Sequence, residues 1–408
     1  MLKSIIRKEI LLNLLSYKFS IIITLSTILI LVSIFVMYRD YCLARENYEI
    51  LESEGAAAVI PHTPLSIFAK GLDENLCRAH EMGFGQRISA SSKQQSVNDL
   101  FKLFTVPDLL YIIKVILSLC AMLFAFDMIS GEKEAGTLRQ SLSGSLGRPI
   151  LITGKWIGGF TSFILPFFIA VLLCTIFVTL SPMVAMSAQD WAKLGLFLLS
   201  GVIYLATFFS LGLLLSCLTH RSSTSLVISL FVWSILVFLI PNLGNILARQ
   251  FVEIPTVQQL ELRRRQIAMS AWQEVNRLPL VSDRIARLAR ARSEGDQVTE
   301  DYRNRFDRLV TLSQSITRVS PTASFTFLAT DLMGTGMLEE GRLKNAVVKY
   351  MFASDNDEDR ERPKFSYQRA SCREALGQGG LNNLLILVLF NILFFSGAYV
   401  TFLRYDAR

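Results

Sequence analysis

The chain has 408 residues, of which 51% are hydrophobic and 18% are charged, and its formal net charge is +7. The apolar residues are bunched into long runs instead of being spread at the intervals that build a globular core. The composition therefore excludes a soluble globular protein and predicts an all-α integral membrane protein.

Six segments are long and apolar enough to cross a bilayer, which takes about 20 residues at a rise of 1.5 Å per residue. We expect transmembrane helices at residues 19–38, 107–127, 156–180, 194–218, 224–247 and 381–403. The first is interpreted as a retained anchor, because it is too long for a signal-peptide core and ends in VMYRD without a small-residue cleavage site.

Lysine and arginine indicate on which side of the membrane each short segment lies. They occur at Lys3, Arg7, Lys8, Lys18, Lys133, Arg139, Arg148, Lys155, Arg221, Arg404 and Arg408, whereas residues 181–191 carry none. Because basic short segments stay in the cytoplasm, both termini and residues 128–155 are expected there. Residues 39–106 and 248–380 then form two extracytoplasmic insertions, since long loops cross largely regardless of charge.

The sequence contains no energy source or catalytic centre of its own. Proton-coupled carriers hold acidic or histidine side chains at bilayer depth, but Lys114 is the one candidate here, and its amine either lines a path or reaches the interface. The run GRPILITGK at 147–155 has the wrong glycine spacing for a phosphate loop and is followed by Trp156 where Ser or Thr would bind magnesium. We predict no enzyme activity, no metal site and no cofactor bound by this chain.

A charged stretch, FDMISGEKEAGTLR, directly follows the second span. Ser130 or Gly131 can cap a helix, Glu132 and Glu134 fall in its first turn, where the helix dipole favours negative charge, and Gly144 suits its end. The pattern predicts one compact helix on the cytoplasmic face of the membrane, which exposes both acids and Arg139.

The run DMISGEKEAGTLRQSLSGSLGRPILITGKWIG resembles the signature of permease subunits of ABC-2 type ABC transporters, in which the charged stretch forms the coupling helix. The matching positions are Asp127, Gly131, Glu132, Lys133, Glu134, Gly136, Thr137, Leu138, Arg148, Gly154 and Lys155. Residues 1–18, with apolar and basic side chains that suit an anionic leaflet, resemble the interfacial elbow helix of that family. The two long insertions indicate a subgroup, such as the gliding-motility and nitrous-oxide-reductase maturation permeases.

The resemblance implies a multi-pass protein of a bacterial inner membrane that pairs with a second permease, identical or different, above cytoplasmic ATPase subunits. ATP and magnesium would bind to those ATPases, and membrane lipids would surround the pair; no nucleic-acid partner is expected. The implied coupling residues are Asp127, Gly131, Glu132, Lys133, Glu134, Gly136, Thr137 and Arg139. Of these, the two glutamates would make polar contacts with the ATPase, and the two glycines would allow close approach.

Gly154 and Gly158 form a G-x-x-x-G pattern at the start of the third span. Such small residues let two helices pack closely. The pattern alone leaves open whether the neighbouring helix belongs to the same subunit or to a partner.

The second insertion has a charged helical pattern over 257–317, interrupted at Pro279 and 293–295, which predicts a bundle of two or three helices. Within it, Arg263, Arg264 and Arg265 either hold an anionic substrate or lipid headgroup, or form a solvated face paired with acidic neighbours. Farther on, Ser320 is expected to cap a helix, with Pro321 at its first position and Gly334 at its end. No disulfide is predicted among the outside cysteines, which are Cys42, Cys77 and Cys372.

Two functions remain open from the sequence. The first is a transport subunit that is driven by a separate ATPase. The second is a membrane-anchored assembly or mechanotransmission protein that binds an extracytoplasmic partner without substrate flux. An intramembrane enzyme is not supported, because no paired acids, Ser/Lys dyad or metal ligands occur at matching depths.

Overall fold

A computed structural model describes residues 2–53, 60–77, 79–83, 87–91, 107–143, 147–353 and 365–405. The chain divides into two compact units. Unit 1 contains Met1–Val237 and Pro321–Arg408, and unit 2 contains Phe238–Ser320.

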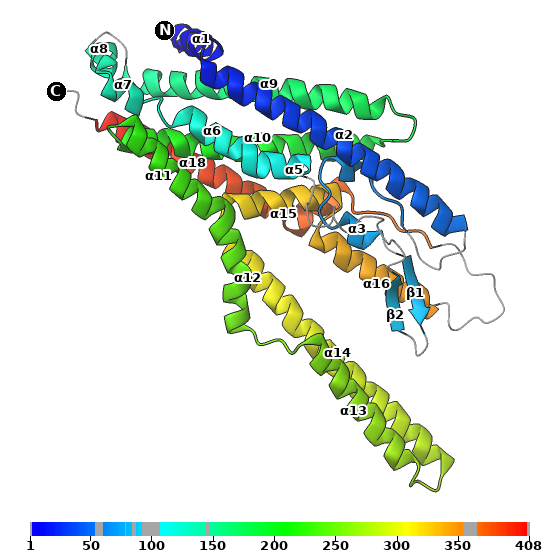
Figure 1. Cartoon of the computed structure of the whole chain (residues 1–408). Helices are drawn as coiled ribbons and strands as arrows, with labels where there is room; N and C mark the ends of the chain where they lie inside the picture. Colours follow the sequence, from blue (N-terminus) through cyan, green and yellow to red (C-terminus); the bar gives the residue numbers. More distant parts are fainter. Residues whose placement is uncertain are drawn as a thin grey trace. The chain divides into compact units, whose positions relative to one another are not determined.

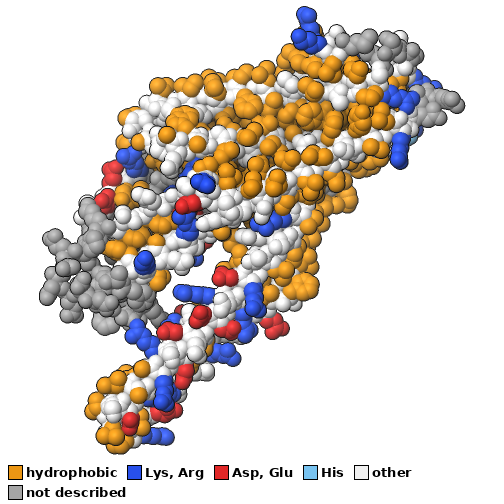
Figure 2. All heavy atoms as spheres, turned by 180° about the vertical axis from the view of Figure 1, so that it is seen from behind, with side chains coloured by type: hydrophobic (Ala, Val, Ile, Leu, Met, Phe, Trp, Pro, Cys, Tyr) orange, Lys and Arg blue, Asp and Glu red, His pale blue; other side chains and the backbone are white. Residues whose placement is uncertain are grey.

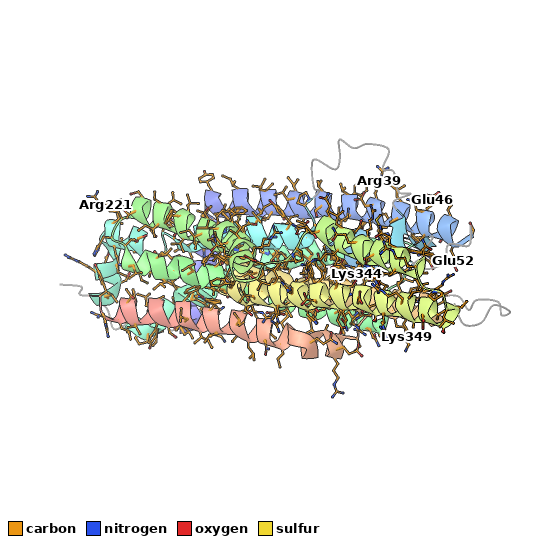
Figure 3. All side chains as sticks on the ribbon, turned by 90° about the horizontal axis from the view of Figure 1, so that it is seen from below. Arg39, Glu46, Glu52, Arg221, Lys344 and Lys349 are labelled. Carbon is orange, nitrogen blue, oxygen red and sulfur yellow. The ribbon has the colours of Figure 1, made fainter. Side chains whose placement is uncertain are left out.

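Six helical segments in the described part of the chain are long and apolar enough to cross a membrane, which confirms the predicted all-α membrane fold. They are Phe19–Ile50, Leu109–Glu134, Arg148–Thr179, Ala188–Leu218, Ser222–Phe251 and Cys372–Leu403. Figure 3 shows labelled charged residues toward the two ends of unit 1, with Arg221 at one end and Glu46 and Lys349 at the other. This distribution fits helices whose middle sections lie in lipid, where charge is costly.

The helices of unit 1 surround α10 (Ala188–Leu218), which packs against α6 (Ser118–Ala125), α18 (Leu381–Leu403) and α9 (Arg148–Thr179). Figure 1 shows these helices running side by side with α2 (Tyr17–Ser53). Aromatic side chains fill the centre, where Tyr204, Phe208 and Phe209 of α10 are fully buried. The remaining apolar helices of unit 1 are α5 (Leu109–Tyr111), a π-helix (Ile112–Leu117) and α11 (Ser222–Ser234).

Helix α15 (Pro321–Met333) packs against α10 and α18 within unit 1. It begins and ends where the Ser-Pro and glycine signals indicate, and Gly334 has a φ of 68°. The ring of Phe325 stacks on Tyr204 at 4.5 Å, and the hydroxyls of Thr322 and Tyr204 are 3.1 Å apart. Helix α15 has 13 residues, which is too short for its hydropathy to identify it as a membrane span. The sequence therefore assigns it to the second insertion, although in the structure it packs on apolar helices.

The segments before and after α15 complete unit 1. Helix α2 continues beyond its expected end at residue 38, and is followed by a 3-10 turn (Pro64–Ile67) and α3 (Asp73–Leu76). The strands β1 (Ala79–Gly83) and β2 (Arg87–Ser91) form an antiparallel hairpin, the one strand pair among the described residues. Helices α16 (Met337–Ala353) and α17 (Cys372–Ala375) follow α15, and a π-helix (Leu376–Gly380) leads into α18. All six cysteines are free thiols.

Unit 2 consists of α12 (Ile240–Phe251), α13 (Val257–Val275) and α14 (Val281–Thr317), preceded by a π-helix at its boundary (Ile235–Leu239). The side chain of Thr256 and that of Gln259 form a capping box at the start of α13. Helices α13 and α14 lie antiparallel in Figure 1. The expected interruption at 293–295 is wrong, because α14 runs through these residues without a break.

Candidate functional site

The charged stretch after the second span forms two short helices, α7 (Ser130–Glu134) and α8 (Thr137–Ser143). The prediction of a single helix is therefore wrong. Gly136 separates the two with a φ of 71°, in the left-handed region that glycine occupies without steric cost. Gly144, the expected end of the single helix, lies outside the described residues.

Lys155 of α9 joins α7 to the N-terminal helix α1 (Leu2–Leu14). Its ammonium nitrogen lies 2.8 Å from Oε1 of Glu132 and 3.0 Å from Oε1 of Glu9. The Lys155 side chain is 5% exposed and that of Glu9 is 10% exposed, whereas that of Glu132 is 28% exposed. Three elements that are distant in sequence therefore meet at one charged cluster, which we call the Lys155 cluster.

The energetics of the Lys155 cluster favour keeping all three groups together. Taking charged groups out of water is costly, and a buried ion pair recovers that cost only when its partners are well placed. Oε2 of Glu132 is buried and has no hydrogen-bond partner among the described residues. With two carboxylates for one ammonium, removal of Lys155 would leave like charges facing each other in a poorly solvated place.

Gly154 and Gly158 bring α1 close enough for this cluster to form. A Cβ atom at Gly154 would lie 2.7 Å from a methyl carbon of Ile5, and one at Gly158 would lie 2.8 Å from Cβ of Glu9. Both distances are too short for real side chains. In this chain the G-x-x-x-G surface therefore receives α1 of the same subunit.

The other motif side chains attach α7 to α10 and α11. The ammonium group of Lys133 donates hydrogen bonds to the carbonyl oxygens of Cys217 and Thr219 and lies 5.0 Å from the centre of the Tyr405 ring. Oε2 of Glu134 accepts a hydrogen bond from the backbone N–H of Ser222, at 2.9 Å, at the start of α11. There the positive end of the helix dipole favours a carboxylate.

The start of α7 is fixed to α10 as well. Oγ of Ser216 accepts hydrogen bonds from the backbone N–H groups of Ile129 and Ser130, at 3.0 and 2.9 Å. Ser130 and Ser216 are both fully buried. Helix α7 thus contacts α9, α10 and α11 through hydrogen bonds or ion pairs of named side chains, and it is linked to α1 through Lys155.

The structure separates the expected coupling residues into two groups. Glu132, Lys133 and Glu134 make the contacts described above, and Gly131 has ordinary van der Waals space around it. Ala135, Gly136, Thr137, Arg139 and Gln140 are exposed, as is Glu134. Asp127, the first motif residue, is partly buried at the end of the second span.

Sequence reasoning missed two members of the site, Glu9 and Ser216. Glu9 is an acid in an otherwise basic and apolar segment, and this mismatch was the available signal. Ser216 lies in a long apolar run, where a serine is common, so nothing in the sequence distinguished it.

The arginines 263–265 lie on the exposed surface of α13. Arg265 is 3.9 Å from Glu261, one turn earlier on the same helix. Arg263 lines a cavity whose other charged residues are of both signs, namely Arg249, Glu253, Asp301 and Arg305. A cavity lined by charges of both signs gives no clear preference for an anion, so the anion-binding role of this patch stays a prediction.

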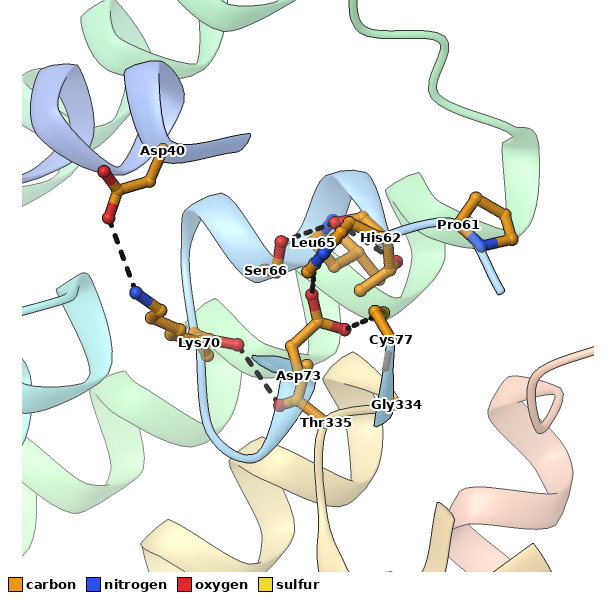
Figure 4. Close-up of polar contacts among 12 residues, drawn as sticks. Asp40, Pro61, His62, Leu65, Ser66, Lys70, Asp73, Cys77, Gly334 and Thr335 are labelled. Carbon is orange, nitrogen blue, oxygen red and sulfur yellow. Dashed lines mark hydrogen bonds and ion pairs between the residues drawn. The ribbon is translucent and has the colours of Figure 1, made fainter. Parts of the chain in front are cut away.

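A second buried polar cluster joins the first insertion to the segment before α18. Figure 4 shows three of its members, His62, Asp73 and Cys77. His62 Nδ1 lies 2.6 Å from one oxygen of Asp73, and Nη2 of Arg369 lies 2.9 Å from the other. Burial raises the pKa of Asp73, but the hydrogen bond with His62 and the charge of Arg369 outweigh it, so the net shift is downward. Burial, reinforced by the Asp73 charge, raises the pKa of the Cys77 thiol.

An arginine supplies positive charge to this cluster. His62, Asp73 and Cys77 are close enough together to hold a cation. However, the guanidinium of Arg369 supplies the positive charge, since its Nη2 atom is also 3.4 Å from the Cys77 sulfur. Arg369 further donates hydrogen bonds to the carbonyl oxygens of Gly334 and Pro61, which holds three loop segments together.

The chain was also compared with known proteins. The model of the family described as ABC-2 family transporter protein matches residues 5–407. A search of curated proteins found no significant match. The family match covers nearly the whole chain, including the Lys155 cluster and both insertions. The chain therefore belongs to the ABC-2 transporter family and is a multi-pass membrane protein of the permease type.

Proposed function

We propose that this chain is a permease subunit that couples ATP hydrolysis by a separate ATPase to export or to conformational work on the extracytoplasmic side. The observation that carries the proposal is the attachment of α7 to α9, α10 and α11, and through Lys155 to α1. A helix joined to its neighbours by several polar contacts can move them together, which a solvated loop cannot do.

The proposed orientation places α7, α8 and both termini in the cytoplasm of a bacterial cell, with the chain in the inner membrane. The basic residues of the short connecting segments support it. The family implies an ABC-type ATPase as partner and typically a pair of permeases.

We assign two roles along the charged stretch. The exposed turn and the first residues of α8, 135–140, would contact the ATPase. Glu132, Lys133 and Glu134 would pass its movement into the membrane helices through their contacts within the chain. This assignment differs from the expectation that both glutamates contact the ATPase directly.

A second candidate function is mechanotransmission without substrate flux. The helical hairpin of α13 and α14 favours it, because α14 alone spans 37 residues, or about 55 Å. A long helical hairpin within the second insertion gives the ATPase something to move other than a substrate. Transport of labelled lipid or peptide in proteoliposomes would separate the two functions.

The test is co-purification of the tagged chain with the ATP-binding protein encoded beside it, followed by ATP hydrolysis in lipid nanodiscs. Arg139→Glu reverses charge on the exposed surface and should abolish recovery of the ATPase. Lys133→Met removes the contacts with Cys217 and Thr219 and should leave recovery unchanged but reduce permease-stimulated hydrolysis.

Lys349→Glu provides the matched control, because Lys349 is an exposed residue at the opposite end of unit 1. It should change neither recovery nor hydrolysis. Normal ATPase recovery with Arg139→Glu would show that residues 135–140 are not the docking surface. Failure of the unmodified chain to retain any ATPase would overturn the proposed function as a whole.

A further inference from the structure

The described part of the first insertion, residues 60–77, places apolar side chains in the core of the spanning helices. Leu65, Ile67, Phe68 and Ala69 are fully buried and belong to the same hydrophobic cluster as side chains of α2, α6 and α10. The 3-10 turn that carries Leu65 and Ile67 contacts both α2 and α10. A segment outside the six spans therefore fills one end of the apolar core, and we call residues 60–77 the plug.

The plug lies at the end of unit 1 opposite to α7. The second span begins at α5, which the plug contacts, and ends at α7. Figure 2 shows hydrophobic side chains over much of the flank of the spanning helices, with lysine and arginine side chains toward their ends. The plug is therefore at an end that meets water, which in the proposed orientation is the extracytoplasmic one.

One set of contacts joins the plug to its neighbours in sequence, α2 and α5. The backbone N–H of Leu110 donates a hydrogen bond to the carbonyl oxygen of Phe68 at 3.2 Å, and that of Lys70 donates one to Oδ2 of Asp108 at 2.9 Å. The ammonium group of Lys70 also lies 3.4 Å from a carboxylate oxygen of Asp40 in α2 (Figure 4). The plug is thus fixed to the helices between which it lies in the chain.

A second set of contacts joins the plug to the turn that follows α15. The backbone N–H of Leu72 donates a hydrogen bond to the carbonyl oxygen of Thr335 at 2.8 Å, and the hydroxyl of Thr335 donates one to the carbonyl oxygen of Ala69 at 3.2 Å. Gly71 has a φ of 49°, and a Cβ atom there would lie 2.6 Å from the hydroxyl oxygen of Thr335. The plug and this turn are therefore in close backbone contact.

Arg369 completes the second set with a single side chain. Its guanidinium lies 2.9 Å from the carboxylate of Asp73 and donates hydrogen bonds to the carbonyl oxygens of Pro61, at 3.1 Å, and Gly334, at 2.7 Å. Pro61 and Asp73 lie in different turns of the plug, so one residue holds both of them against the turn after α15. We call Thr335 and Arg369 the latch.

Helix α10 connects the latch with α7. Near one end of α10, Ser216 binds the start of α7. Farther along α10, the rings of Tyr204 and Phe197 stack on Phe325 of α15, at 4.5 and 6.2 Å. Helix α15 directly precedes the turn that contains Thr335. A displacement of α7 therefore reaches the latch through one continuous helix of 31 residues, or about 46 Å.

We propose that the latch opens when the ATPase moves α7 and α10, which separates the plug from the turn after α15. The contacts that part are hydrogen bonds and one ion pair, whose groups water can satisfy once they are exposed. All six cysteines are free, so no disulfide ties the plug to that turn. The plug stays with α2 and α5, and its buried face becomes accessible from the extracytoplasmic side. The inference rests on the proposed function, because the ATPase supplies the movement.

Cys77 is a native reporter of the latch. It is 8% exposed, and its sulfur lies 3.4 Å from Nη2 of Arg369. For the test, Cys42 and Cys372 are replaced by serine, and the complex with the ATPase in nanodiscs is treated with a charged maleimide. Mass spectrometry of the peptide that contains residue 77 gives its rate of labelling. The rate should be several-fold higher with ATP than with ADP.

Arg369→Gln tests the latch directly. It removes the guanidinium that holds Pro61, Asp73 and Gly334, so Cys77 should label several-fold faster already with ADP. Arg373→Gln is the matched control, because Arg373 is an exposed residue of α17, and it should leave the labelling rate unchanged. Equal rates in the two variants would overturn the role of Arg369.

A disulfide lock separates opening of the latch from local unfolding. A Cβ atom at Gly71 would lie 3.0 Å from Cβ of Thr335, close to the separation in a disulfide, which is about 3.5–4.5 Å. Gly71→Cys with Thr335→Cys, in a chain whose Cys42, Cys77 and Cys372 are serine, should form this bond on oxidation. Permease-stimulated ATP hydrolysis should then fall several-fold and return with dithiothreitol. Gly71→Cys alone is the control, and its hydrolysis should not change on oxidation.

The outcomes distinguish the latch from the proposed function. Equal labelling of Cys77 with ATP and ADP, in a complex that hydrolyses ATP, would overturn the latch and leave the proposed function standing. Undiminished hydrolysis after the 71–335 bond is confirmed by mass spectrometry would have the same meaning. A chain that retains no ATPase would overturn the proposed function and, with it, the latch.

Discussion

Lys155 shows how one buried residue can hold distant elements together. Lys155→Met leaves Glu9 and Glu132 facing each other without their counter-charge, and removing one partner of a buried ion pair typically costs about 3–5 kcal/mol. We expect a clear drop in the melting temperature of the purified protein in detergent. The triple variant with Glu9→Gln and Glu132→Gln should recover much of it. A single variant as stable as the unmodified protein would show that the cluster is well solvated.

Asp73 gives the stability of the protein a defined pH dependence. Its pKa is lower in the folded chain than its ordinary value of 3.8, so between those two values the unfolded chain binds more protons. The Asp73 contribution is therefore complete above pH 3.8 and is lost as the pH falls through the folded-state pKa. The stability difference between the unmodified protein and Asp73→Asn should be constant from pH 5 to 6 and shrink at lower pH, as followed by thermal unfolding. A difference that grows toward acid pH would contradict this.

At the scale of elements, the packing of α1 on α9 depends on the absence of a side chain at Gly158. Alanine normally stabilises a helix relative to glycine by up to about 1 kcal/mol. Gly158→Ala should nevertheless destabilise the protein and increase hydrogen exchange in residues 2–14, because its Cβ would meet Cβ of Glu9 and the carbonyl oxygen of Ile6. Gly195→Ala in α10 is the control, since its Cβ would have no neighbour within 4 Å. If both variants behaved alike, α1 would not be held by this contact.

Other elements show where sequence patterns reach their limit. The ends of α15 were readable from Ser320, Pro321 and Gly334, because the signals that start and stop a helix lie in a few adjacent residues. Its packing against α10 was not readable, because a 13-residue helix carries no sign of its neighbours. Likewise, the break at Gly136 depends on a backbone angle that glycine permits but does not require.

For the whole molecule, the sequence by itself determined the all-α membrane class, the six spans and the family signature. These are local properties, since each depends on residues within one continuous stretch of the chain. Only the tertiary structure decided that Lys155 lies between Glu9 and Glu132, which are 146 and 23 residues away from it along the chain. It alone also showed that the coupling stretch contacts α9, α10 and α11 and is linked to α1 through Lys155. Long-range contacts of this kind follow from how the helices pack, which no pattern within a single helix specifies.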